Sequence, residues 1–266
     1  MWHLLAFDGV DSAAADFEQI PAVLDQIVTQ SPNGNYILQQ DMRVRAAYYR
    51  DAGATLARLN TPDWRRVSIP SINPVQRQAG VTNLPAYGRY YPGSIVIPKI
   101  DELIFQASND GAGGVAQVGG LWISPLNDTL NIPSGDVYKV HAAATSTGIA
   151  GTWELVPFVL DQNLPTGTYA VIGLDVVQDG ATGAVEFARL AWTGGAQAGG
   201  GQPWRPGVTI RHGFAEQNWE NWQNGNWGTL GSFTSTAQPN LEVFSDPGTG
   251  VGLDIFMDII QVSRSI

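Results

Sequence analysis

The chain has 266 residues, of which 44% are hydrophobic and 14% are charged, and its formal net charge is −10. This composition argues against a disordered chain, and the acidic balance argues against a protein that coats nucleic acid through a generally basic surface. The absence of cysteine excludes disulfides and thiolate metal sites. A chain of this length is sufficient for one large domain or two small ones.

Charged residues are scarce, since an average soluble domain contains about 25% of them. Lysine occurs only at Lys99 and Lys139. Because protein interfaces are depleted in lysine, this scarcity indicates a subunit of an assembly. No apolar stretch is long enough for a transmembrane helix, and residues 1–7 lack the basic start of a secretory signal.

The first predicted element is a helix within residues 11–30. Phe17, Ile20, Leu24 and Ile27 recur at spacings of three and four, which is one face of a helix. Pro21 allows a second helix to begin there, because proline is tolerated at the first helical position.

Almost everything after this helix predicts strands. Residues 36–48 and 251–259 alternate between apolar and polar side chains, and residues 168–177 are apolar on both faces. Hairpin-type Asp-Gly and Asn-Gly pairs separate many of these runs. About a dozen short strands with regular turns predict an antiparallel sandwich or barrel. Further strands are predicted at 65–72, 94–98, 102–108, 115–123, 137–144, 152–160, 184–192, 206–212 and 240–245.

The irregular stretch 74–92 suggests a division of the chain. We expect residues 1–93 to form an N-terminal region with the helix and a β region, and residues 94–266 to form the strand-dense body.

A basic segment interrupts the otherwise acidic sequence. Residues 43–89 contain eight arginines and two acidic residues. Such a segment can bind the acidic face of a neighbour, lipid headgroups or nucleic acid, although solvated strand faces or pairs within the subunit explain it equally well. The candidate contact residues are Arg43, Arg45, Arg50, Arg58, Arg65, Arg66, Arg77 and Arg89.

Motifs of catalysis are missing from the sequence. His3, His141 and His212 form no helical zinc pair, and no Gly-x-Ser-x-Gly sequence is present. A structural or surface role is expected for His141 and His212 rather than a role in a catalytic triad. We therefore predict no catalytic residue, no metal and no cofactor. Carboxylates that a glycosidase would need are available at Glu154, Glu186, Glu216, Glu220 and Glu242.

Trp219, Trp222 and Trp227 form a cluster among Asn and Gln residues. Three interpretations remain open for this cluster. The rings can cover the end of a core, anchor a protein–protein contact, or stack on sugars while the amides bind hydroxyl groups.

Residues 95–262 resemble the jelly-roll shell proteins of tailless icosahedral viruses of bacteria and archaea. The residues that carry the resemblance are the run 163–173, the strand 184–192, the Trp-Arg-Pro-Gly-Val run 204–208 and the closing pair 240–244 and 251–262. The resemblance implies an antiparallel jelly-roll sandwich that assembles into a shell, often as trimers and sometimes over an internal membrane. Some members of the family have two jelly rolls in one chain.

The sequence therefore predicts an all-β, antiparallel jelly-roll β-sandwich. It is either a single roll with an N-terminal helix and arm, or a compact double jelly roll whose first roll is degenerate.

The predicted function is that of a non-enzymatic capsid subunit that self-assembles in the virion as a homotrimer within a larger shell, after synthesis in the host cytoplasm. Other capsid proteins, an internal membrane and the packaged genome are further candidate partners. The alternative is a carbohydrate-binding β-sandwich, such as a lectin or host-attachment module, and a glycoside-active enzyme is a third hypothesis.

Overall fold

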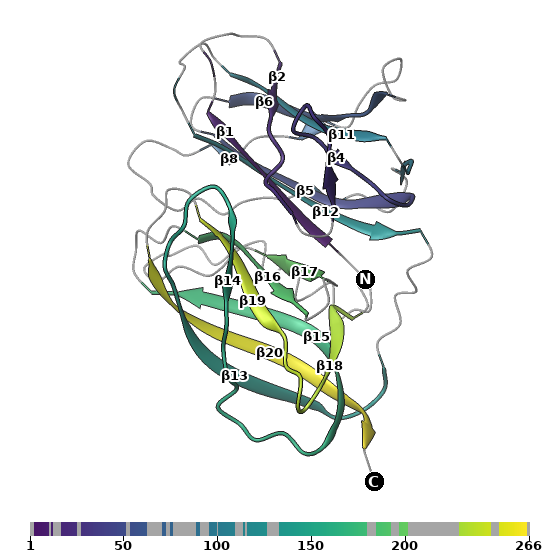
Figure 1. The fold of residues 1–266 in the computed structure, drawn as a ribbon, viewed down its shortest axis with the longest axis vertical. Coiled ribbons are helices and arrows are strands. Elements are labelled where there is room, and N and C mark those ends of the chain that lie inside the picture. Colours follow the sequence, from purple (N-terminus) through teal and green to yellow (C-terminus); the bar gives the residue numbers. More distant parts are fainter. Residues whose placement is uncertain are drawn as a thin grey trace. The chain divides into compact units, whose positions relative to one another are not determined.

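Two compact units, Leu4–Leu126 and Asn127–Ile266, divide the chain, and the first three residues group with the second unit. Both units consist of predominantly antiparallel β-sheets, with one short parallel pair of strands in the first unit (Figure 1). Among the residues described, there is no helix with the length and apolar character needed to cross a membrane. The computed structural model describes residues 3–10, 12, 17–25, 28–51, 54–62, 71–72, 75–76, 89–90, 96–99, 101–109, 114, 116–126, 133–179, 185–192, 197–201, 229–245 and 250–264.

Eight described strands make up the second unit, in two four-stranded sheets of order β13-β20-β15-β18 and β14-β19-β16-β17. The strands are β13 (Val137–Ser146), β14 (Trp153–Val156), β15 (Gly167–Gln178), β16 (Val185–Ala191), β17 (Gln197–Gly201), β18 (Gly231–Thr234), β19 (Asn240–Ser245) and β20 (Val251–Arg264).

The pairing of these strands is that of a long hairpin rolled up on itself. The first strand pairs with the eighth, the second with the seventh, the third with the sixth and the fourth with the fifth. Rolling then brings the eighth strand beside the third, and the seventh beside the fourth. This connectivity defines a jelly roll.

Alternation along β20 explains how the sequence produces this sheet. Leu253, Ile255, Met257 and Ile259 are at most 2% exposed, whereas the residues between them face the opposite side of the sheet. Burial of four large apolar side chains on one face fixes the register, because a slip by one residue would expose all of them.

The first unit contains twelve described strands in two sheets, β1-β12-β5-β10 and β3-β4-β11-β6-β7; β8 and β9 add to the first sheet and β2 to the second. The strands are β1 (His3–Val10), β2 (Glu18–Ile20), β3 (Thr29–Gln30), β4 (Tyr36–Ile37), β5 (Met42–Asp51), β6 (Ala54–Asn60), β7 (Ser71–Ile72), β8 (Val75–Gln76), β9 (Arg89–Tyr90), β10 (Val96–Ile97), β11 (Glu102–Asn109) and β12 (Ala116–Pro125).

The same rolled hairpin recurs in this unit. The eight positions of the roll are taken in chain order by β1, β2, β5, β6, β7, β10, β11 and β12. The hairpin pairs are β1–β12, β2–β11, β5–β10 and β6–β7, and rolling adds β12–β5 and β11–β6. The chain is therefore a double jelly roll, the second of the two forms that the sequence allowed.

Aromatic side chains fill the core of the first roll. The Phe7 ring lies 5.3 Å from that of Tyr36 and 4.8 Å from that of Phe105, and all three residues are fully buried. A Cβ at Gly119 would lie 3.0 Å from the Phe105 ring, so the absence of a side chain there lets β12 pack closely over the ring.

The predicted helix at residues 11–30 was wrong for the part of this segment that the structure describes. Ile20 lies in β2, pairs with Phe105 and is 1% exposed, but Leu24, expected on the same buried face, is 71% exposed. The helix-like spacing arose by coincidence, because tertiary pairing with β11 overrides the local pattern.

The division of the chain also differs from the expected boundary at 93/94. Strands β10, β11 and β12 lie after that boundary but pair with β5 and β6 of the first unit. The division follows Leu126 because the last three strands of the first roll must return to its earlier strands to close it.

Candidate functional site

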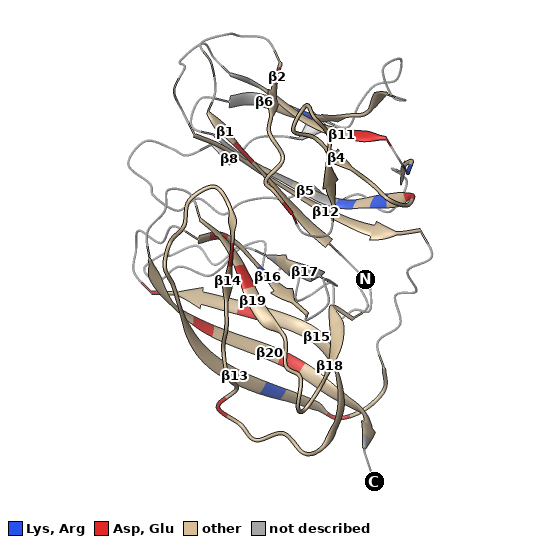
Figure 2. Cartoon of the chain, viewed as in Figure 1, with Lys and Arg blue, Asp and Glu red and all other residues tan. Residues whose placement is uncertain are grey.

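The outer face of the β13–β20–β15 sheet concentrates charged side chains of the second roll. Lys139 and His141 lie on β13, and Asp254 and Asp258 lie on β20. Figure 2 shows a basic residue in blue on β13 and acidic residues in red along β20. Register places Lys139 opposite Asp258, and Asp254 opposite the residue two places beyond His141. Cross-strand neighbours on one face interact directly, so the strand pairing itself assembles this cluster.

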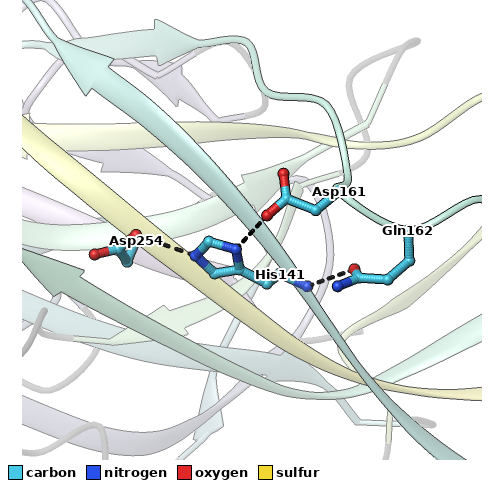
Figure 3. A network of polar contacts seen from close by, with 4 residues as sticks. All are labelled: His141, Asp161, Gln162 and Asp254. Atoms are coloured by element: carbon cyan, nitrogen blue, oxygen red, sulfur yellow. Dashed lines mark hydrogen bonds and ion pairs between the residues drawn. The ribbon is translucent and has the colours of Figure 1, made fainter.

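His141 lies between two carboxylates (Figure 3). Its Nδ1 is 2.5 Å from Oδ2 of Asp161, in the connection between β14 and β15, and its Nε2 is 3.0 Å from Oδ1 of Asp254. The ring also packs against Phe256, with 4.7 Å between centroids. The His141 ring thus links β13 to β20 and to the connection between β14 and β15.

This geometry requires the charged form of His141. A neutral imidazole has a single N–H, whereas the imidazolium donates from both nitrogens and can satisfy both carboxylates. Hydrogen bonds to Asp161 and then to Asp254, together with the negative charges of both carboxylates, raise the pKa of His141 above its ordinary value, while burial acts to lower it. His141 therefore carries a positive charge further into the neutral range than an ordinary histidine.

Lys139 balances two further carboxylates on the same face. Its Nζ lies 3.7 Å from Asp175 and 3.8 Å from Asp258, and 5.9 Å from the centroid of the Phe256 ring. Burial raises the pKa of Asp258, and the nearby Asp175 raises it further, while Lys139 lowers it. Lys139, Asp175 and Asp258 thus form a chain of ion pairs across β13, β15 and β20.

His141 links two carboxylates, and we call this arrangement the two-carboxylate clamp. Both of its ring nitrogens are occupied by carboxylates, so neither is available to take a proton from a nucleophile in this arrangement. No group of three or more possible ligands that could hold a metal ion occurs among the described residues. The structural role expected for His141 from the sequence agrees with this geometry.

Glu154 is a buried carboxylate that organises the turn between β13 and β14. Its Oε1 accepts hydrogen bonds from the N–H and Oγ1 of Thr147 at 2.6 and 2.9 Å. Its Oε2 accepts from Ser146 Oγ at 2.9 Å, from the Gly148 N–H at 3.0 Å and from the Ile149 N–H at 3.4 Å. Burial raises the pKa of Glu154, but these hydrogen bonds outweigh it, and the pKa lies below its ordinary value.

A buried charge pair joins β16 and β19. Arg189 Nε and Nη2 lie 2.8 and 2.7 Å from Oε2 of Glu242, and the guanidinium stacks 3.7 Å from the centroid of the Trp153 ring. Arg189 is 1% exposed and Glu242 5% exposed.

The two glutamates do not converge as a glycosidase pair would. Glu154 is opposite Val243 and Glu242 is opposite Leu155, so the two carboxylates extend to different faces of one sheet. Glu186 is buried on β16, and Glu216 and Glu220 lie outside the described residues.

The predicted basic patch is not a single surface in the part of it that the structure describes. Arg43 and Arg45 extend from β5, and Arg58 extends from β6 in the other sheet of the same roll. Arg58 donates to Gln106 at 2.9 Å and lies 3.8 Å from the centroid of the Phe17 ring. Outside the described residues or side chains lie Arg50, Arg65, Arg66, Arg77 and Arg89.

The predicted tryptophan cluster, Trp219, Trp222 and Trp227, lies outside the described residues. The link from His141 to Asp161 was not predicted, because twenty residues separate the two and only the roll brings them together. The alternation expected through residues 251–259 is confirmed, and it leaves Asp254 and Asp258 on the outer face of β20.

Comparisons with known proteins identify no family for this chain. No family model matches the sequence, and no curated protein matches it. Among solved structures, the chain is similar to the major capsid protein P2 from Bacteriophage PM2, with 11% sequence identity, a TM-score of 0.26, and coverage of 100% of this chain and 99% of that chain. A TM-score this low carries no argument, so the double jelly roll is assigned from the strand order of the chain itself.

Proposed function

We propose that this chain is a subunit of a protein shell, the capsid of a virion, and that it builds the shell by self-association. The observation that carries the proposal is the repetition of a complete jelly roll within one chain. Jelly rolls serve in viral capsids and also in lectins and cupins. Two rolls in succession correspond to the two-roll members of the shell-protein family that residues 95–262 resemble.

The surface of the described residues supports this function. Large apolar side chains are exposed in both units, and charged residues make up only 14% of the sequence. A subunit that is covered by neighbours needs few charges, and its contact surfaces are enriched in apolar groups. The exposed large apolar residues are Val10, Leu24, Val137, Tyr138, Ile149, Leu155, Val159 and Val262.

In this proposal the chain has a structural role in the virion and assembles with copies of itself, as trimers within the shell. Other capsid proteins, an internal membrane or the genome contact its remaining faces. Arg43 and Arg45 on β5 and Arg58 on β6 belong to different sheets of the first roll, so they would meet different neighbours. No catalytic step and no cofactor enter the proposal.

The proposal is tested on particles from cells that make the protein. Particles are purified by density, and each protein in them is quantified by mass spectrometry. We expect this chain to be among the most abundant components, in a copy number compatible with a closed shell. Its absence from particles, or a few copies per particle, would overturn the proposal.

The carbohydrate-binding alternative depends on Trp219, Trp222 and Trp227. These residues lie outside the described part of the chain, and the alternative stays a prediction.

A further inference from the structure

Among the strands that the structure describes, β13 lies at the edge of its sheet, because the order β13-β20-β15-β18 gives it a partner on one side only. It spans ten residues, and the apolar side chains of Val137 and Tyr138 at its start are 55% and 43% exposed. Val262, two residues beyond the partner of Val137 on β20, is 43% exposed. A long edge strand with apolar surroundings readily pairs with another strand unless something covers it.

Two consecutive residues cover this edge at His141. The Asp161 N–H donates to the His141 carbonyl at 2.9 Å. The His141 N–H in turn donates to Oε1 of Gln162, also at 2.9 Å (Figure 3). Both backbone groups that His141 directs away from β20 are thereby occupied. We call Asp161 and Gln162 the edge guard.

Side chains fasten the edge guard to the sheet. The Asp161 carboxylate meets Nδ1 of His141 at 2.5 Å, and Asp254 of β20 holds the other ring nitrogen at 3.0 Å. The guard is thus bound to β13 by its backbone, by the Gln162 amide and by an ion pair.

The directions of the other backbone N–H and C=O groups along the edge of β13 follow from the two-residue period of a strand. Alternate residues of an antiparallel edge strand direct their N–H and C=O groups to the same side. Because His141 directs both groups outward, Ala143 and Thr145 do so too, and both side chains are exposed. The guard therefore interrupts an edge whose neighbouring backbone groups have the correct direction for strand pairing.

We propose that the edge guard prevents β13 from pairing with β13 of a second copy of this chain, and that displacing the guard allows this antiparallel contact. Two identical antiparallel edge strands form a self-complementary, two-fold interface that needs no other partner. A register with His141 opposite Ala143 also places Lys139 opposite Thr145, so no like charges face each other across the pair. The guard thus keeps the free subunit from joining through the wrong surface.

The test uses the full chain with Asp161→Ala and Gln162→Ala together, at concentrations at which the wild-type protein does not assemble. Sedimentation equilibrium should give a mass that rises toward twice 28.5 kDa with concentration for the double variant. Asp175→Asn, on the same face but away from the edge, serves as the matched control and should follow the wild type.

A third variant shows whether β13 carries the contact. Ala143→Pro removes an N–H that points out of the edge, so it blocks pairing with a second copy while the pairing with β20 is kept. Added to the double variant, it should restore the wild-type mass. The proposal is wrong if the double variant stays at the wild-type mass, or if its dimer persists with Ala143→Pro.

Hydrogen exchange on the β13 peptide gives a readout independent of mass and reports whether the variant is folded. In the double variant, the His141 amide should exchange faster than in the wild type at low concentration, and more slowly as concentration rises. Exchange that does not change with concentration would also contradict the proposal. Both readouts compare variants of the free subunit, so their outcome is separate from that of the particle experiment.

Discussion

Replacing Glu154 by Gln should destabilise the second roll without changing the size of the side chain. The carboxylate accepts hydrogen bonds with both oxygens, from the Thr147 N–H and hydroxyl on one side and from Ser146, Gly148 and Ile149 on the other. An amide has one oxygen and one NH2 group. Whichever way it is turned, its NH2 group faces a backbone N–H, and neither group can accept the hydrogen bond.

The size of the effect follows from these contacts. A hydrogen bond to a charged group contributes about 1.5–3 kcal/mol. Glu154→Gln removes at least one such bond and converts the others to weaker neutral ones, in a site where the residue is 8% exposed. We therefore expect a loss of about 2–4 kcal/mol in the free energy of unfolding of the second roll at pH 7.

The loss should depend on pH in a defined direction. Because the folded-state pKa of Glu154 is lowered, its ionised form contributes stability that is fully present above about pH 4.5 and is lost as the pH falls through the folded-state pKa. The stability difference between the wild type and Glu154→Gln should therefore shrink below this pH.

Urea unfolding, read peptide by peptide through hydrogen exchange, measures this difference for each roll separately. Glu102→Gln is the matched control, because Glu102 accepts a hydrogen bond from Asn35 at 3.1 Å that a glutamine oxygen can also accept. The control should cost less than about 1 kcal/mol. The reasoning is refuted if Glu154→Gln costs no more than Glu102→Gln, or if its cost is the same at pH 7 and below pH 4.

Three other predictions follow from individual contacts. An NMR titration should place the pKa of His141 above its ordinary value of 6.5. The contribution of His141 to the free energy of unfolding should be fully present below about pH 6.5 and should be lost as the pH rises through the raised pKa. A pKa at or below 6.5 would contradict the two-carboxylate clamp. Arg189→Met should cost about 3–5 kcal/mol in urea unfolding, because it removes the guanidinium that faces the buried Glu242 carboxylate. Adding Glu242→Leu should recover most of this loss, and a single variant as stable as the wild type would contradict the prediction. A Cβ at Gly200 would lie 1.8 Å from the Ala188 carbonyl oxygen, so Gly200→Ala should separate β17 from β16 and speed hydrogen exchange of residues 197–201; unchanged exchange would show that the strands accommodate it.

Long strands with one buried face could be predicted from the sequence. The alternation through residues 251–259 identified the buried side of β20, and in the structure Asp254 and Asp258 lie on its outer face. The alternation predicts such strands because each is long enough to show a repeat of two residues, and because one face of its sheet is buried.

The first roll could not be recognised in the same way. Several of its strands, including β3, β4, β7, β9 and β10, are two residues long, and two residues have no period. Their places in the sheets are set by long strands elsewhere in the chain. The false helix at residues 11–30 has the same origin, since Ile20 is buried through its pairing with Phe105, far along the chain.

The clamp at His141 was beyond prediction for a related reason. Asp161 and Asp254 lie 20 and 113 residues away in sequence, and only the connectivity of the roll brings both to one ring. A histidine on the outer face of a predicted strand indicates an accessible imidazole, but not which carboxylates will meet it.

The native mass of the purified chain shows whether it associates as a shell subunit must. Light scattering over a range of concentrations, with electron micrographs of the same sample, distinguishes a 28.5-kDa monomer from trimers and closed shells. A subunit built of two jelly rolls for a capsid should form trimers or shells as its concentration rises. A chain that remains a monomer at every concentration and in the presence of its candidate partners, membrane and nucleic acid, would contradict the account.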